Sequence, residues 1–284
     1  FLKIINNNAN HGGGGVYIRQ SSSLITNTII SNNSAFWGGG LEVYGITESN
    51  NSPNFSNLRI TQNISDDYGG GIKIQNSDPS ITNSVILGNS SNQNLGGAIS
   101  ISSGSPLLTN LTVVDNSGSG IYVFDAVENT TTAPILKNLI LFGNSESSFS
   151  NEIYVYSGSL ISASYSLIEG GYEGEGIIDV DPLFCNPDSG DYTLAENSPC
   201  MGTGEGGANM GAFGVGCGPY NFSPTNFSLS APSNNAQITI DDSNMNDGFI
   251  TFSWDESSDE NGDSLVYLLH ATSTEIEDFS LDTN

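Results

Sequence analysis

The sequence predicts an all-β protein, a parallel β-solenoid of about seven turns followed by part of a β-sandwich. Two observations predict the solenoid: a unit of 26 to 30 residues recurs along the chain, and no segment shows helical periodicity. Because a unit of this size cannot bury a hydrophobic face alone, it must stack on its neighbours. In such a stack each short strand pairs with its equivalent one turn away, at about 4.8 Å.

The repeating unit is marked by two asparagines six residues apart, with an apolar residue midway between them. Five copies carry the pairs Asn27/Asn33, Asn57/Asn63, Asn83/Asn89, Asn110/Asn116 and Asn138/Asn144, at steps of 30, 26, 27 and 28 residues. Weaker copies end at Asn7 and lie near Tyr165 to Gly171. The seven copies together set the expected number of turns.

Glycine, proline and asparagine have separate roles in this unit. A glycine cluster after the second asparagine supplies the positive φ angles that a corner needs, and a proline before the first one enters a strand where its missing N–H is tolerated. Asparagine recurs because stacked amides hydrogen-bond to one another along the column. We therefore expect structural asparagine columns, so that Asn83→Leu or Asn110→Leu destabilises the middle of the stack.

The strand that follows the glycine cluster alternates apolar and other residues, with the first and third residues facing inward. Its outward positions form two columns, Tyr17, Glu42, Lys73, Ser100, Tyr122, Tyr154 and Arg19, Tyr44, Gln75, Ser102, Phe124, Tyr156. The six aromatic members are the candidate binding residues: Tyr17, Tyr44, Tyr122, Phe124, Tyr154 and Tyr156. They could stack on sugar rings or fill a protein interface, although aromatic residues are also favoured in strands without any further role.

The strand that follows the first asparagine places a second set of apolar side chains outward. The members of this stripe are Ile29, Val85, Leu87, Val114, Ile140 and Phe142. Such a stripe is rarely left in water. Either long loops or the following domain cover it, or it contacts another chain, in self-association or with another surface protein. On the second hypothesis, changing Val85, Leu87 and Phe142 to Ser abolishes assembly and leaves the fold intact.

Charge limits the possible partners. The chain carries 31 Asp and Glu against 5 Lys and Arg, a formal net charge of −26. It should therefore repel nucleic acid and anionic membranes. Since no apolar stretch approaches the length of about 18 residues that spans a bilayer, we expect no membrane insertion.

No constellation of catalytic residues is evident. The five cations, Lys3, Arg19, Arg59, Lys73 and Lys137, are spread over several units, and none has an obvious acidic cluster at the matching position of a neighbouring unit. The nearest candidate is the pair Asp66 and Asp67, which shares a unit with Arg59 and Lys73. Solvated surface charges are the simpler interpretation, so we expect no catalytic site.

The three cysteines, Cys185, Cys200 and Cys217, all lie within 33 residues after the last repeat. A disulfide there could hold the last turn against fraying, which suggests export to an oxidising compartment. Cys185 with Cys200 would close a 15-residue loop, but the sequence does not determine the pairing. The alternative is that all three are reduced.

After residue 219 the glycine corners stop, and residues 220–284 alternate like the first strands of a sandwich, with Trp254 as the expected core aromatic. Within them the residues 254–265, WDESSDENGDSL, form the densest acidic stretch. Its oxygen ligands could hold calcium, with Asp255, Asp259, Asn261 and Asp263 as the candidates. The alternative is a plain polar turn. We expect no other cofactor.

The repeating unit and the segment 179–217, DVDPLFCNPDSGDYTLAENSPCMGTGEGGANMGAFGVGC, resemble secreted bacterial right-handed parallel β-helix proteins, which are similar in fold to pectin lyases. The resemblance covers about residues 1–219. It implies a right-handed solenoid at an extracellular or cell-surface location. Residues 220–284 resemble the N-terminal part of a fibronectin type III or immunoglobulin-like module, truncated here because only some 65 residues are present.

Two functions from different classes follow. The first is a non-catalytic extracellular structural or adhesive protein, in which a rigid solenoid presents surfaces for self-assembly or for contact with cell surfaces or polysaccharide. The second is a carbohydrate-active enzyme, a polysaccharide lyase or glycoside hydrolase whose subsites are the aromatic columns. The shortage of cations and of paired carboxylates favours the first.

Overall fold

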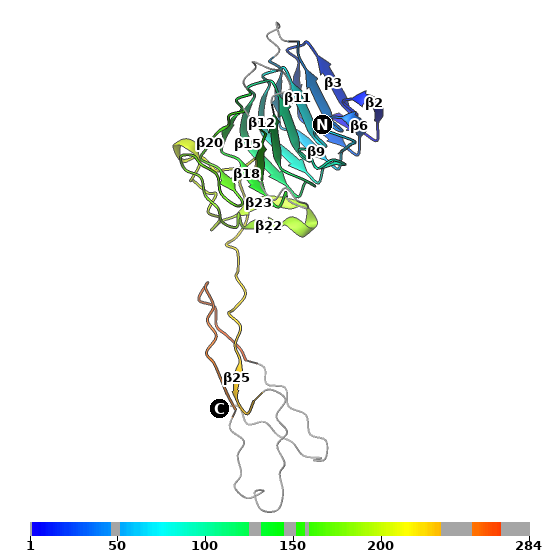
Figure 1. The fold of residues 1–284 in the computed structure, drawn as a ribbon. Coiled ribbons are helices and arrows are strands. Elements are labelled where there is room, and N and C mark those ends of the chain that lie inside the picture. Colours follow the sequence, from blue (N-terminus) through cyan, green and yellow to red (C-terminus); the bar gives the residue numbers. More distant parts are fainter. Residues whose placement is uncertain are drawn as a thin grey trace, which may run out of the picture. The chain divides into compact units, whose positions relative to one another are not determined.

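The computed structural model describes residues 2–46, 52–124, 132–144, 152–156, 159–233 and 252–267. The chain divides into two compact units, Phe1–Tyr220 and Asn221–Asn284. The first unit is a parallel β-solenoid of about five turns (Figure 1). This number is lower than the predicted seven, because the last copy of the repeat provides only two short strands before the chain leaves the solenoid.

Three parallel sheets form the sides of the solenoid. Sheet A contains β1 (Leu2–Ile5), β4 (Leu24–Thr26), β5 (Thr28–Ser31), β8 (Asn54–Ser56), β9 (Arg59–Thr61), β12 (Ser80–Leu87), β15 (Leu107–Val114), β17 (Ile135–Lys137), β18 (Ile140–Phe142), β20 (Ser162–Ser164) and β21 (Leu167–Ile168). Sheet B contains β2 (Asn8–Gly12), β6 (Ser34–Trp37), β10 (Ile64–Ser65) and β13 (Ser90–Ser91). Sheet C contains β3 (Val16–Arg19), β7 (Leu41–Tyr44), β11 (Ile72–Gln75), β14 (Ile99–Ser102), β16 (Ile121–Phe124) and β19 (Ile153–Val155).

The core is built from stacked aliphatic side chains. Ile72 pairs with Ile99, which pairs with Ile121, and all three are fully buried. On sheet A, Ile60, Ile86 and Val113 form an equivalent buried column. Both columns follow the inward register that the alternation of apolar residues predicts.

The two asparagines of each unit have different environments. The second one is buried: both the N–H and the Nδ2 of Asn63 donate to Asn89 Oδ1, each at 2.9 Å, and the pattern repeats from turn to turn. The first one has a positive φ, such as +49° at Asn83, which asparagine tolerates better than most residues. The amides of this column stack as predicted, since Asn110 Nδ2 donates to Asn83 Oδ1 at 2.9 Å, but Asn83 is exposed and Asn110 is half-buried.

Glycine is required at the corner between sheets B and C for two reasons. Gly69 has a φ of +67°, which strains other residues. A Cβ on Gly70 would lie 2.2 Å from the carbonyl oxygen of Ser90 in the next turn, so the backbones could not approach as they do. The glycine cluster therefore permits both the bend and the stacking of successive turns.

A segment after the last repeat, called the cap here, folds back over the outer face of sheet A. It comprises β22 (Phe184–Asn186), η1 (Pro187–Ser189), β23 (Asp191–Ala195), η2 (Glu205–Gly207) and β24 (Val215–Cys217). A second hydrophobic core joins the cap to the sheet, with Val114, Ile140, Leu167, Phe184, Tyr192, Leu194, Cys200 and Met210 as its buried members. The N–H of Ala212 also donates to Thr112 Oγ1 at 2.9 Å.

The disulfide joins Cys185 to Cys217, and Cys200 is a free, fully buried thiol. The pairing of Cys185 with Cys200 is thus not formed. The reason lies in the sheet of the cap, where β23 pairs with both β22 and β24 and brings the two strands that carry Cys185 and Cys217 close together. Burial raises the pKa of the Cys200 thiol to about 12.

The cap covers much of the outward apolar stripe. Val85, Val114 and Ile140 are at most 4% exposed, and Leu87 and Phe142 are half-buried against the second core. Among the six residues of the stripe, Ile29 is half-buried and does not belong to the second core, since it lies near the N-terminal end of the sheet. The chain itself therefore occupies the surface around Leu87, Val114, Ile140 and Phe142, as the first alternative expects, and contact of the stripe with another chain stays a prediction.

The second unit is described only over residues 221–233 and 252–267, where β25 (Leu229–Ala231) and β26 (Ser253–Trp254) pair antiparallel. The rest of the predicted sandwich lies outside the described residues. Trp254 is 38% exposed and packs on Tyr267 at 5.4 Å between ring centroids, so it is less buried than expected. Across the described residues, no helix has the length and hydrophobicity needed to span a bilayer.

Candidate functional site

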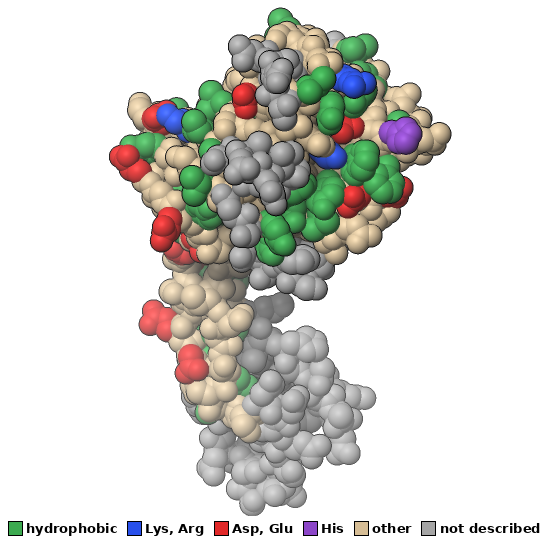
Figure 2. All heavy atoms as spheres, turned by 45° about the horizontal axis from the view of Figure 1, so that its top comes forward, with side chains coloured by type: hydrophobic (Ala, Val, Ile, Leu, Met, Phe, Trp, Pro, Cys, Tyr) green, Lys and Arg blue, Asp and Glu red, His purple; other side chains and the backbone are tan. Residues whose placement is uncertain are grey.

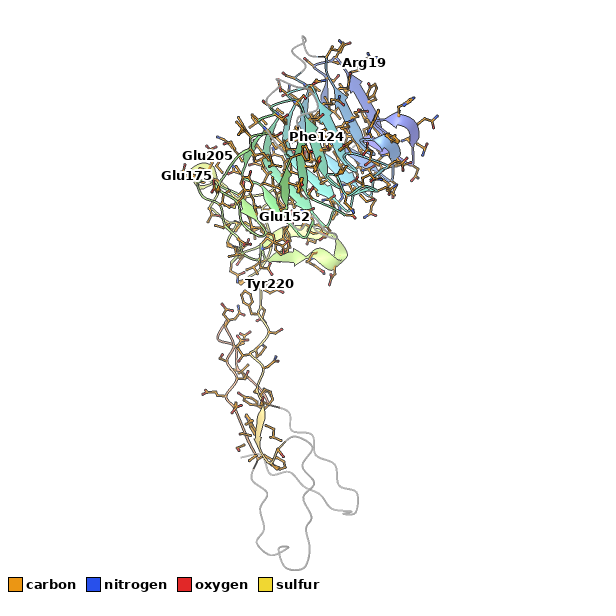
Figure 3. All side chains as sticks on the ribbon, in the orientation of Figure 1. Arg19, Phe124, Glu152, Glu175, Glu205 and Tyr220 are labelled. Carbon is orange, nitrogen blue, oxygen red and sulfur yellow. A yellow bond between two sulfur atoms is a disulfide. The ribbon has the colours of Figure 1, made fainter. Side chains whose placement is uncertain are left out.

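A groove of about 740 Å³ runs along the outer face of sheet C. Its floor consists of Tyr17, Arg19, Glu42, Tyr44, Lys73, Gln75, Ser102 and Phe124, from five successive strands of the sheet. Its wall consists of His11, Gly12, Trp37, Asp67 and Tyr68, from sheet B and the corner that follows it. Arg19 lies at the N-terminal end of this face and Phe124 lies further along the solenoid (Figure 3). On the face shown in Figure 2, green hydrophobic side chains lie beside single blue basic and red acidic ones.

The two outward columns have the register that the sequence predicts. Tyr17 is opposite Glu42, Glu42 is opposite Lys73, and the second column runs in step from Arg19 to Phe124. Of the six candidate aromatic residues, Tyr17, Tyr44 and Phe124 line the groove, whereas Tyr122, Tyr154 and Tyr156 do not. A binding role for any of them stays a prediction.

Tyr122 is enclosed by its neighbours and offers no open ring face. It is 8% exposed, lies parallel to Tyr154 at 5.4 Å between centroids, and packs on Phe124 at 5.3 Å. Burial is the main reason why the pKa of Tyr122 is raised to about 12. The side chain therefore supports the floor beside the groove.

Trp37 and Tyr68 complete the groove and do not belong to the outward columns. Each directly precedes the glycine cluster of its unit, so their equivalent positions were a usable signal in the sequence. Tyr68 stacks on Phe124 at 4.8 Å between centroids, and Trp37 Nε1 donates to Asp67 Oδ2 at 3.1 Å. These contacts hold both rings against the floor.

A buried ion pair lies beneath these rings. Lys73 Nζ is 3.8 Å from Glu42 Oε1 and 4.2 Å from the centroid of Trp37, and both charged side chains are at most 6% exposed. Gly12 lies directly over the carboxylate, because a Cβ there would be 1.4 Å from Glu42 Oε2. Burial lowers the pKa of Lys73, opposed by the charges of Glu42 and Asp67, and burial raises the pKa of Glu42, opposed by Lys73.

The Lys73–Glu42 pair corrects the expectation that no cation has an acidic neighbour at the matching position. The candidate group of Asp66, Asp67, Arg59 and Lys73 is brought together only in part. An acidic residue does stand at the matching position next to Lys73, since Glu42 is its partner one turn away. The structure brings Asp67 and Lys73 into one groove. It does not bring Asp66 and Arg59 there, because Asp66 Oδ1 accepts from Asn92 Nδ2 at 3.0 Å and Arg59 lies on sheet A.

Arg19 adds a charge at the rim. Its guanidinium lies 5.8 Å from the centroid of the Tyr44 ring, and the side chain is exposed. An arginine stacked on a tyrosine keeps its N–H groups free to donate within the plane of the guanidinium. Tyr17, 50% exposed, stands beside it.

The acidic turn of the second unit has the geometry of a polar turn. Asp259 Oδ1 accepts from the N–H groups of Asn261 and Asp263, both at 3.0 Å, and Asn261 Oδ1 accepts from the N–H of Phe222 at 2.7 Å. Asp255 is exposed. Over the part of the chain that the structure describes, no three acidic, histidine or cysteine side chains come together as a metal site. Calcium binding stays a prediction.

A family described as "Right handed beta helix region" matches residues 2–134. No curated protein and no solved structure matches this chain in sequence or structure comparison. The family match agrees with the observed solenoid. It indicates no particular function, since this fold occurs in both enzymes and structural proteins.

Proposed function

We propose that this chain is a non-catalytic extracellular adhesive protein whose solenoid binds an extended saccharide chain in the groove of sheet C. The observation that carries the proposal is the series of aromatic rings along one groove, contributed by four of its five turns: Tyr17, Trp37, Tyr44, Tyr68 and Phe124. The apolar face of a pyranose ring packs on such rings, while its hydroxyl groups need polar partners between them.

The size of the groove favours a chain of sugars over a single one. Its floor extends from β3 to β16, which are four strand spacings apart, or about 19 Å. Gln75 and Ser102 lie between the aromatic positions. Because the strands repeat at a constant spacing, a ligand with its own repeating unit could make similar contacts at several turns.

The buried charges favour binding without chemistry. Lys73 and Glu42 are paired with each other and covered by Trp37 and Gly12. A group that serves as acid or base must reach the proton that it transfers. The pair is instead placed to hold Trp37 in position by a cation–π contact.

Secretion is supported by the disulfide between Cys185 and Cys217, because such bonds persist in oxidising compartments. The net charge of −26 also favours solubility and limits non-specific binding to anionic surfaces.

The test is calorimetric titration against neutral and acidic oligosaccharides of increasing length. We expect affinity to rise with length, and Tyr17→Ala or Tyr44→Ala to weaken binding by about tenfold each, since each removes one ring from the floor. Tyr156→Ala is the matched control, because Tyr156 is 57% exposed on the same face but outside the groove. Absence of binding, or an equal loss in the control, would refute the proposal.

One observation favours a second candidate, cleavage of a polysaccharide in the same groove. The pKa of Lys73 is lowered and that of Glu42 is raised, and perturbed groups of this kind cluster at catalytic sites. Incubation with polysaccharides should then release new reducing ends or unsaturated uronates, and Lys73→Met should abolish this activity. Binding with no product over long incubation would eliminate this candidate.

A further inference from the structure

A second cavity, of about 310 Å³, lies where the cap meets the outer face of sheet A, and we call it the cap cavity. Val114 and Phe142 line it from sheet A, and Phe184 and Tyr192 line it from the cap. All of its lining residues belong to the first unit, and none of them lines the groove of sheet C. Its volume is at the lower end of the range of small-molecule sites, about 300 to 1,000 Å³.

The floor of the cap cavity is apolar. Val114 is 1% exposed, and Phe184 and Tyr192 are 6% exposed each, as members of the second core. The rings of Phe184 and Tyr192 meet edge to face at 5.2 Å between centroids, and Phe142 packs against the same core. A floor of this kind favours an alkyl chain or the stem of a long side chain.

The rim of the cap cavity is acidic. Asp115, Asp181 and Asp188 line it and are exposed, and none of the described lining residues is Lys, Arg or His. Arg59 lies near the cap, since its Nη2 would be 4.0 Å from a Cβ on Gly190, but it does not line the cavity. The ion pairs formed among the described residues involve none of the three carboxylates. The cavity thus combines an apolar floor with negative charge that no cation of the described chain balances.

Two of the carboxylates are fixed by hydrogen bonds and keep oxygen atoms for a ligand. The Tyr192 hydroxyl donates to Asp115 Oδ2, and Asp181 Oδ1 accepts from the N–H of Leu183 at 2.8 Å. A carboxylate has about four acceptor positions, so each can accept further hydrogen bonds. The three carboxylates surround the cavity without converging as a metal site, a grouping that the described residues form nowhere. Their spread suits a cation with an organic body.

We propose that the cap cavity binds an alkylammonium ion, with the alkyl chain on the apolar floor and the ammonium group at the acidic rim. The ammonium group has three donors for the carboxylates and is also attracted by the faces of aromatic rings. The ligand is either a free amine or the lysine side chain of another protein, because both have the same chemistry. This site is separate from the saccharide groove and adds a second binding activity to the first unit.

The test is calorimetric titration of the full chain with propylammonium and pentylammonium chloride near physiological salt. We expect one site per chain and an affinity about three- to tenfold higher for pentylammonium, because its longer chain covers more of the floor. Pentanoate has a chain of similar length and the opposite charge, so it should not bind. Cations attracted only by the net charge of −26 would show no dependence on chain length.

A matched pair of variants locates the site. Asp181→Asn should weaken pentylammonium binding about fivefold, since it removes one charge from the rim. Asp179→Asn is the control, because Asp179 is exposed and does not line the cavity. The two residues are otherwise alike: each has an Oδ1 that accepts from a backbone N–H, of Leu183 or of Gly170, and an Asn oxygen can keep that bond. Both changes alter the net charge equally.

A third ligand identifies the source of the ammonium group. Nα-acetyl-lysine methylamide presents a lysine side chain on a short stretch of backbone. Binding within about threefold of pentylammonium would support the proposal with a protein lysine as the ligand. Much weaker binding of this compound, beside tight binding of pentylammonium, would support it with a free amine.

Three results would overturn the proposal: no binding of pentylammonium, equal affinities for the short and the long amine, or equal losses in the Asp181 and Asp179 variants. The last two would show that amines gather on the acidic surface without a site. Since the variants leave the groove of sheet C unchanged, saccharide binding is measured separately on the same proteins.

Discussion

Asn83 and Asn89 lie six residues apart in the same turn and stabilise it in different ways. At Asn83 the backbone has a φ of +49°, and the exposed side chain accepts a single hydrogen bond, from Asn110 Nδ2 at 2.9 Å. Asn89 is fully buried, donates to Asn116 Oδ1 and to the carbonyl oxygen of Ile60, and accepts from Asn63. Here the side chain itself completes the hydrogen bonding of the interior.

We expect Asn89→Gly to lower the free energy of unfolding by about 3 kcal/mol, because it leaves the buried donors of Asn63 without an acceptor. Asn83→Gly removes the same side chain but keeps the positive φ accessible, so its cost should be below about 1 kcal/mol. Urea denaturation of both variants measures the difference. Equal costs would contradict the separate roles of the two columns.

The ladder ends on a carboxylate. The N–H and Nδ2 of Asn144 donate to Glu152 Oε1 and Oε2 at 2.9 and 2.6 Å. Burial raises the pKa of Glu152 to about 7, opposed by these hydrogen bonds and reinforced by Glu169. A raised pKa of an acid means that folding favours the protonated form. The stability from this group is thus fully present below pH 4.5, its unfolded value, and is lost as the pH rises through 7.

We expect the free energy of unfolding to fall between pH 5 and pH 8 by up to about 3 kcal/mol because of Glu152. In Glu152→Gln this part of the pH dependence should vanish, whatever the absolute stability of the variant. The measurement is chemical denaturation of both proteins across this range. Parallel curves for the two proteins would show that another group titrates.

At the scale of elements, the cap is held by short strands and by one disulfide. Its sheet contains β22, β23 and β24, with register shifts in both pairings. Cys185 and Cys217 lie on its two outer strands, 32 residues apart in sequence. Their bond therefore restrains the whole segment that covers sheet A.

Replacing Cys185 and Cys217 by Ser should reduce stability by about 3 to 4 kcal/mol, the amount expected for closing a loop of this length. Reducing agent should have the same effect on the natural chain and none on the double variant. Cys200→Ala serves as control and should leave the response to reducing agent intact. A cap that is insensitive to reduction would contradict the restraint.

At the scale of the whole molecule, the cap decides which surfaces of the solenoid are available. Ile29 and Ile140 belong to one outward column of sheet A. Ile140 is 1% exposed beneath the cap, where Gly211 approaches it closely, but Ile29 is half-buried outside the second core. Equivalent positions in the repeat thus have different environments.

Ile140→Ser should cost about 4 kcal/mol, since it removes buried apolar volume and leaves a hydroxyl in its place. Ile29→Ser should cost less than about 2 kcal/mol. Thermal unfolding of the two variants, supported by limited proteolysis of the cap, makes the comparison. If the two costs are similar, the cap does not seal this face.

The repeat by itself determined the solenoid and the inward and outward sides of the strands in sheets A and C, whereas the short strands of sheet B were not expected. These features depend on contacts between equivalent residues about 27 positions apart, and a regular spacing is visible in the sequence. The pairing of Glu42 with Lys73 was predictable in the same way, because the two stand next to each other in an outward column.

Only the tertiary structure decided the groove, the covered stripe and the disulfide. The groove needs Trp37 and Tyr68, whose side chains extend over sheet C from the corner before it. The spacing of the repeat predicts which residues share a column of one sheet, but not how far a side chain extends from one sheet over the next. The stripe and the pairing of Cys185 with Cys217 depend on how the cap folds back over sheet A. The cap contains no repeat, so its contacts form between residues at irregular separations in the sequence. The spacing of residues therefore does not predict these contacts.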